Sequence, residues 1–269
     1  MITYSATLDV PEATAVLLTD LLIAERRRRG TGIGARAASA RIQAVLVLRW
    51  LREDTGIPTL ARDAGVSQAT GYRYLHEGID VLAARAPDLH SALEQGKAAG
   101  WSHVVLDGTL IRTDRCRVSN PASGHDLWYS GKHHAHGGTV QVVCAPDGFP
   151  VAVSDVQPGS MHDLAAARAT GLLGALHPAA ALLGLPALAD KAYHGAGIGI
   201  HTPAKGAHPA PSTATRNRLL TRLRAEGERG IALLKTRWKA LRHVRLCPQR
   251  IGAIAAAALV LTIAERPIR

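Results

Sequence analysis

The hydrophobic pattern of this 269-residue chain changes its period at residues 96–101. Before that point, apolar residues recur about every 3.6 positions in residues 11–29, 38–53 and 59–82, which predicts helices. After it, short β-branched runs separated by turn residues occupy 102–113, 138–148 and 149–156, which predicts strands. We therefore predict an all-α domain over residues 1–98, followed by a second domain over residues 99–269.

The second domain mixes strands with helices. Residues 162–176 and 215–242 have helical periodicity, the longer run with a possible interruption near Gly227 and Gly230, and residues 182–190 are typical of a buried strand. The order of elements predicts an α/β fold with a mixed sheet. Residues 251–265 are Ala-rich and shorter than the ~18 apolar residues of a membrane span, so we expect a buried C-terminal helix there.

The charge of the chain points to a polyanionic partner. The formal net charge is +11, and residues 205–250 hold twelve Lys or Arg against only Glu226 and Glu228. A basic segment of this kind is typical of nucleic-acid binding. The three cysteines are far apart and the N-terminal residues lack the pattern of a secretory signal, so we expect a cytoplasmic protein that binds no membrane.

Residues 57–82 have the pattern of a helix-turn-helix. Gly65 suits the tight turn, and Ser67 is placed to cap the second helix. In a DNA-binding interpretation, the N-terminal half of that helix presents Gln68, Thr70, Tyr72 and Arg73 to a groove or to phosphates. A helical hairpin used for packing or dimerisation explains the same pattern, and Gly71 stands where recognition helices usually bury an aliphatic side chain. Both interpretations stay open.

Three carboxylates stand in separate contexts. Asp107 and Asp190 each end a predicted strand, and Glu228 lies in the basic helix. Carboxylates at adjacent strand ends, with a third from a helix, can hold two divalent ions. At 100° per residue, Glu228 falls within roughly 60° of a set of basic side chains. We expect this set to bind DNA phosphates around a metal-binding Glu228. The set is Arg224, Lys235, Lys239 and Arg242, and the apolar stripe beside it is Ile231, Leu234, Trp238 and Leu241.

Five blocks in order resemble a known family. They are "VVLDGTLI", "WYSGKHHAHGGTVQVVCAPDG", "VQPGSMHD", "LADKAYHG" and "AEGERGIALLKTRWKALR". The chain is similar over roughly residues 40–245 to bacterial insertion-sequence DDE transposases of the Harbinger-related group, the insertion-sequence family five type. The segment 66–82 resembles their N-terminal helix-turn-helix. The resemblance implies a ribonuclease H-like catalytic domain whose metal triad is Asp107, Asp190 and Glu228.

The same resemblance implies the chemistry and the partners. It implies two Mg²⁺ (or Mn²⁺) ions, cleavage and joining of double-stranded DNA at terminal inverted repeats and target sites, a homodimer, and association with the bacterial nucleoid. The family's signature around the glutamate is matched by Arg224, Glu228 and Lys235. Thr221 stands where the family has Tyr, and Ala192 replaces the usual glycine. These departures concern the positioning of the DNA end more than the binding of metal.

The stretch "GKHHAHGG", residues 131–138, places His133, His134 and His136 within four positions. On a strand, His134 and His136 share one face while His133 points to the other, so coordination by all three is awkward. We expect Lys132, His133 and His134 to face phosphate at the entrance to the strand. His162 and Asp163 are expected to cap the next helix or to support the site.

Two alternatives to an active transposase remain. An HD-type metal phosphohydrolase could use the histidine cluster, "MHD" at 161–163 and Asp190, although that fold is all-helical. A catalytically inactive or domesticated DNA-binding protein derived from a transposase is the second alternative, and the intact acids argue against it.

Overall fold

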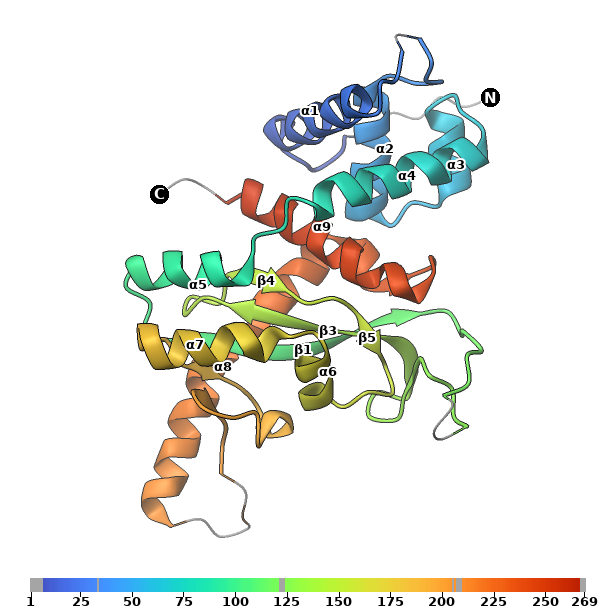
Figure 1. The fold of residues 1–269 in the computed structure, drawn as a ribbon. Helices are drawn as coiled ribbons and strands as arrows, with labels where there is room; N and C mark the ends of the chain where they lie inside the picture. The colour runs from blue at the N-terminus through green and yellow to red at the C-terminus, as the bar shows by residue number, and fades with distance from the viewer. Residues whose placement is uncertain (1–6, 33, 121–123, 205, 207–209, 267–269) are drawn as a thin grey trace.

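The computed structural model describes residues 7–32, 34–120, 124–204, 206 and 210–266. Figure 1 shows a central sheet with helices on both faces and a group of helices stacked on one side. Within the described residues, every helix is too short or too polar to span a membrane.

The central sheet is mixed, as predicted. Its strands are β1 (Val104–Thr113), β2 (Tyr129–Ser130), β3 (Ala135–Cys144), β4 (Pro150–Val153), β5 (Gln157–Pro158), β6 (Ala187–Leu188), β7 (Ile200–His201) and β8 (His243–Val244). The main path runs β2-β3-β1-β6-β7, with β1 antiparallel to β3 and parallel to β6. The predicted hairpin forms between β3 and β4, where Gly148 takes a φ of 82°. The mixed sheet is inconsistent with an all-helical phosphohydrolase.

The predicted N-terminal helices are confirmed. They are α1 (Glu12–Arg28), α2 (Ala40–Glu53), α3 (Ile57–Asp63) and α4 (Gln68–Ala83). α5 (Leu89–Ala98) follows, in a segment for which the periodicity predicted no separate helix. The helices that follow are α6 (Asp163–Ala169), α7 (Leu172–Leu183), α8 (Pro211–Arg237) and α9 (Ile251–Ala264). Short 3₁₀ turns are η1 (Lys191–Tyr193), η2 (Lys239–Leu241) and η3 (Pro248–Arg250).

Two hydrophobic cores lie on the two faces of the sheet. One core joins α1–α4, α8 and α9 to the face of β1 and β3 that carries Val105 and Val142. The other joins α5 and α7 to the opposite face, which carries Val104 and Leu106. The buried helix α9 lies between α4 and the sheet (Figure 1), as expected for residues 251–265. The division at residues 96–101 into two domains stays a prediction.

Two predicted elements differ from the structure. The helix predicted over 162–176 is divided into α6 and α7 at Gly171, whose φ is 70°. The strand predicted over 182–190 pairs only at Ala187–Leu188, because α7 continues through Leu183. A fully apolar run of this length does not by itself distinguish a helix end from a strand.

The predicted helix over 215–242 was wrong at its middle and at its C-terminal end. α8 is continuous through Gly227 and Gly230 and ends at Arg237. Added Cβ atoms at the two glycines would lie 2.4 Å from Val105 Cγ1 and 2.3 Å from the Gly148 carbonyl oxygen. The glycines are therefore the positions where α8 approaches the sheet most closely.

α8 ends because Trp238 leaves the helical conformation and becomes completely buried, with its indole N–H donating to Thr262 Oγ1 at 2.8 Å. Lys239 and Arg242 consequently lie beyond the helix. The prediction that they share one helical face with Glu228 was therefore wrong.

The α3–α4 pair has the predicted turn. Gly65 takes a φ of 65°, and Ser67 Oγ accepts from the Thr70 N–H at 3.2 Å. Gly71 is buried, and a Cβ there would lie 3.0 Å from Ala61 Cβ. The glycine thus lets α4 pack closely on α3 where a larger side chain was expected.

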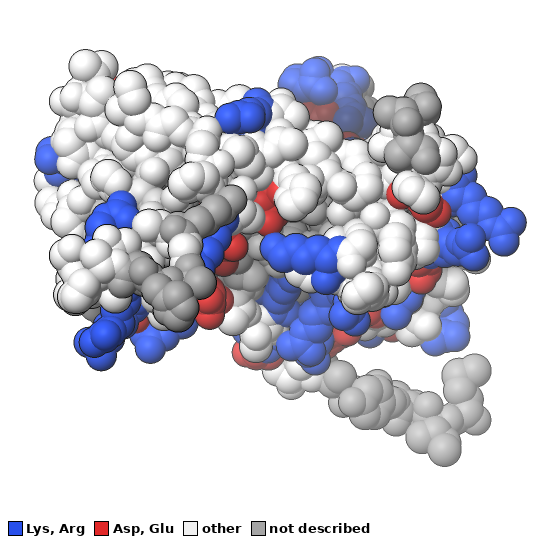
Figure 2. Space-filling view, turned by 90° about the horizontal axis from the view of Figure 1, so that it is seen from below, with Lys and Arg blue, Asp and Glu red and all other residues white. Residues whose placement is uncertain are grey.

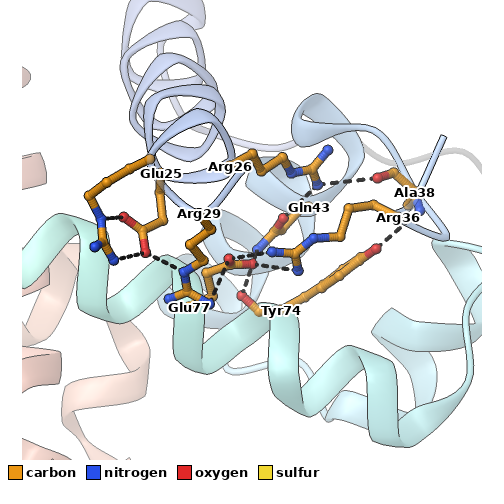
Figure 3. A network of polar contacts seen from close by, with 9 residues as sticks. Glu25, Arg26, Arg29, Arg36, Ala38, Gln43, Tyr74 and Glu77 are labelled. Carbon is orange, nitrogen blue, oxygen red and sulfur yellow. Dashed lines mark hydrogen bonds and ion pairs between the residues drawn. The ribbon is translucent and has the colours of Figure 1, made fainter. Parts of the chain in front are cut away.

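A polar network fixes α4 against α1 and α2 (Figure 3). The buried Glu77 carboxylate accepts from Arg36 at 2.8 and 3.1 Å and from Gln43 at 2.8 Å. Gln43 in turn accepts from Arg26 at 2.8 Å. Part of the basic run 26–29 is therefore used inside the helical group rather than on a free surface.

Candidate active site

Asp107 lies within β1 on the face that meets α8. The prediction that it ends a strand was wrong, because β1 continues through Thr113. Val105 and Thr109 share this face because side chains alternate along a strand, and the Lys235 ammonium of α8 donates to Thr109 Oγ1 at 2.6 Å. Between these contacts, Arg224 Nη2 lies 3.9 Å from Asp107 Oδ1. Only 20% of the Asp107 side chain is exposed. The carboxylate thus stands partly buried beneath a guanidinium.

The electrostatic surroundings of Asp107 disfavour its ionised form. Burial raises the pKa of Asp107 to about 6; Arg224 opposes this rise, and the negative charges of Asp190 and Asp163 add to it. Carboxylates that crowd one another in this way share a site that a cation would stabilise.

Asp190 is brought level with Asp107 by strand register. β6 runs parallel to β1, with Val105 opposite Leu188, so Asp107 and Asp190 each stand two residues past a paired position. Asp190 Oδ1 accepts from the Ala192 N–H at 2.8 Å and begins the 3₁₀ turn η1. The alanine found in place of the family's glycine is accommodated in that turn.

Asp163 is a third acid near β1. A Cβ at Gly108 would lie 2.5 Å from Asp163 Oδ1, so the glycine leaves room for this carboxylate. Lys132 Nζ donates to Asp163 Oδ2 at 3.0 Å. His162 takes the N-cap position of α6 without a side-chain capping hydrogen bond, so its predicted capping role was wrong. The sequence signal for Asp163 was the "MHD" block alone.

Glu228 is exposed on α8, one turn after Arg224. Over the part of the chain that the structure describes, no group of three or more His, Cys, Asp or Glu side chains is gathered closely enough to hold a metal ion. The donor chemistry nonetheless fits Mg²⁺, which prefers carboxylate oxygens. Asp107, Asp163 and Asp190 influence one another electrostatically, whereas Glu228 must turn from solvent to join them.

The floor of the site contains a polar pair that sequence reasoning missed. The Tyr193 hydroxyl, 1% exposed, donates to Gln141 Oε1. Gln141 stands opposite Gly108 in the β1–β3 register. A Cβ at Gly108 would also lie 3.0 Å from the Tyr193 hydroxyl. This pair therefore closes the sheet face beneath Asp163, and its only sequence signal was Tyr193 in the "LADKAYHG" block.

The predicted DNA-binding residues fall into two places. On α4, Gln68, Tyr72 and Arg73 are exposed, and Thr70 is half-buried and accepts from Arg73 at 2.9 Å. Near the acids, Lys132 is exposed and Arg224 is largely buried. Lys239 and Arg242 are exposed beyond the end of α8. Figure 2 shows Lys and Arg side chains over the face seen from below, with acidic side chains between them.

Lys235 differs from the other basic residues, because its ammonium is held inside by Thr109 and by the Leu110 carbonyl at 3.0 Å. Burial lowers the pKa of Lys235, and Arg112 adds to this effect. This lysine therefore ties α8 to β1 in the structure.

The histidines of residues 131–138 do not lie on one strand. β3 begins at Ala135, so residues 131–134 form a turn in which His134 has a φ of 47°. The strand-face argument was therefore wrong for His133 and His134. His136 Nε2 lies 3.2 Å from Asp126 Oδ2, and its ring packs edge-on against Tyr129. His133 instead lines a cleft next to Lys132.

Comparison with known proteins gives one match. The model of the family described as DDE superfamily endonuclease matches residues 106–262, more than half of the chain. No curated protein and no solved structure matches this chain. The matched segment contains Asp107, Asp163, Asp190 and Glu228.

Proposed function

The chain belongs to the DDE superfamily of endonucleases, and we propose that it is an insertion-sequence transposase of the Harbinger-related type. The observation that carries this proposal is the register of β1 and β6, which brings Asp107 level with Asp190 inside the matched segment. Arg224 lies beside Asp107 and Lys132 beside the neighbouring Asp163, which provides positive charge for phosphate binding. The proposed substrates are the terminal inverted repeats of the element and its target DNA.

Asp107 and Asp190 are the proposed metal ligands, with Glu228 as the third carboxylate once its side chain turns toward β1. Two bound Mg²⁺ or Mn²⁺ ions supply activation of a water or a DNA 3′-hydroxyl and stabilise the leaving oxygen. Arg224 Nη2 lies 3.9 Å from Asp107 Oδ1, so its guanidinium is a donor for a phosphate brought to that carboxylate. Asp190 is held in place by its hydrogen bond to Ala192.

DNA recognition is proposed to involve both halves of the chain. The α3–α4 pair acts as a helix-turn-helix in this proposal, with Gln68, Thr70, Tyr72 and Arg73 directed to the inverted repeats. Lys132 contacts a phosphate near the acids, and Lys239 and Arg242 contact DNA phosphates beyond the end of α8. Lys235 supports them by fixing α8 to β1. The proposed assembly is a homodimer on DNA in the bacterial nucleoid.

The test compares acid variants on DNA that carries the repeats flanking the gene. Asp107→Asn, Asp190→Asn and Glu228→Gln are each expected to abolish strand cleavage in Mg²⁺ and to keep binding of the ends in a gel-shift assay. Asp20→Asn, at an exposed acid of α1, is the control and should cleave normally. Full cleavage by any of the three acid variants refutes the triad. Binding without cleavage by the unaltered protein supports a domesticated DNA-binding protein instead.

A further inference from the structure

A cleft of about 210 Å³ opens next to Asp163. Its walls are the turn that precedes β3 and the loop that precedes α6, and Thr139 of β3 lies at its floor. The side chains that define its chemistry are Ser130, Lys132, His133, Ser160, His162 and Asp163. Because Asp163 also approaches Gly108 of β1, the cleft adjoins the acids of the candidate active site.

We propose that this cleft binds a phosphate group of the DNA strand, next to the phosphate that reacts. The proposal rests on the proposed function for the identity of the ligand. The lining supplies an ammonium, two imidazoles and three hydroxyls, which are the donors that bind phosphate oxygens. None of the described residues that line it is Phe, Tyr or Trp, so its aromatic groups are the two imidazoles, which serve here as hydrogen-bond donors.

Lys132 connects the cleft with the acids. Its ammonium is 3.0 Å from Asp163 Oδ2, yet 60% of the Lys132 side chain is exposed, against 13% for Asp163. Burial opposes but does not cancel the effect of this hydrogen bond, which raises the pKa of Lys132. The lysine therefore stays charged, and its flexible side chain can turn from the carboxylate to a phosphate in the cleft.

His133 adds a hydrogen bond rather than a charge. Burial lowers the pKa of His133, and the neighbouring Lys132 lowers it further. A neutral imidazole donates through one ring nitrogen. The cleft thus combines the Lys132 ammonium and the Asp163 carboxylate with neutral donors. Once the ammonium turns from the carboxylate, this set suits a single phosphate of a strand whose neighbouring phosphate meets the acids.

Gly131 allows the cleft to be filled without changing its charge. It lines the cleft, its φ is not positive, and a Cβ there would meet no heavy atom within 4 Å. Gly131→Phe should therefore fold normally and occupy the space. Gly174 in α7 has the same open surroundings, so Gly174→Phe is the matched control, and equal melting temperatures for the two variants check folding.

The first measurement is titration of the metal-free protein with inorganic phosphate, followed by calorimetry. We expect Gly131→Phe to weaken phosphate binding at least tenfold and Gly174→Phe to leave it unchanged. With DNA as the ligand, the slope of log K against log[salt] should become less steep by about 0.9 in Gly131→Phe. This is the change expected for one lost phosphate contact. Lys132→Gln should act in the same direction.

The proposal that the cleft binds phosphate is refuted if Gly131→Phe and Gly174→Phe have equal phosphate affinity, or if the unaltered protein binds no phosphate. An unchanged salt slope with DNA also overturns it, even where phosphate binds. If Gly131→Phe loses phosphate binding and the unaltered protein cleaves no DNA, the transposase proposal is refuted and the phosphate site stands. The two inferences can therefore fail separately.

Discussion

Replacing Glu77 by glutamine should destabilise the protein through the network of Figure 3. Only 6% of the Glu77 side chain is exposed, and its two oxygens accept from Arg36 and Gln43. Arg29 Nη1 lies 3.5 Å from the same carboxylate. Glutamine keeps the shape of the side chain, but it removes the negative charge and directs an NH₂ group at donors.

The loss of stability comes from the arginine side chains that Glu77→Gln leaves without a charged partner. Breaking a buried ion pair by removing one member costs about 3–5 kcal/mol. Arg36 is 24% exposed and Arg29 is 48% exposed, so water can solvate them in part. We therefore expect Glu77→Gln to lower the free energy of unfolding by about 2–3 kcal/mol, measured by urea denaturation followed by circular dichroism.

The control is an ion pair on the surface of the same helical group. Arg28 pairs with Glu25 three residues earlier, and 71% of the Arg28 side chain is exposed. Arg28→Ala should cost no more than about 0.5 kcal/mol. If Glu77→Gln costs no more than Arg28→Ala, the network does not hold α4 in place and the reasoning fails.

Two further predictions concern the contact between α8 and the sheet. Gly227→Val should lower the free energy of unfolding by about 1–3 kcal/mol through overpacking, because even a Cβ would lie 2.4 Å from Val105 Cγ1; an unchanged urea midpoint would show that α8 does not pack there. Burial raises the pKa of Cys144 to about 12, so at pH 8 a thiol reagent should modify the exposed Cys247 rapidly and Cys144 only as the protein unfolds. Mass spectrometry of peptides after brief labelling checks this, and rapid labelling of Cys144 would contradict it.

The elements that could be predicted from the sequence are those whose patterns are local. The helices up to α4 and the β3–β4 hairpin follow from spacing and turn residues, and the Ser67 cap follows from one residue type. The end of α8 could not be predicted, because it depends on the burial of Trp238 against α9. The close approach of Gly227 to Val105 is likewise a property of packing.

The acids of the candidate active site could also be predicted only in part. Asp107 and Asp190 could be singled out as carboxylates of predicted strands, but Asp107 lies within β1 rather than at its end. The parallel pairing of β1 with β6, which brings the two acids level, could not be read from either segment alone. Nothing local indicated that Asp163 would approach Gly108 across the sheet face, or that Arg26 would be used by Gln43 inside the helical group. The arginine run contributed to the basic charge in the sequence, but its partners lie in distant segments.

Strand transfer is the most direct test of a transposase. A labelled DNA end that carries the flanking inverted repeat would be incubated with the protein, Mg²⁺ and a supercoiled target plasmid. We predict that the unaltered protein joins the label covalently to the plasmid and that Asp190→Asn, although it still binds the end, gives no joined product. Joining by Asp190→Asn at the unaltered rate, or end binding by the unaltered protein with no joined product, would contradict the account.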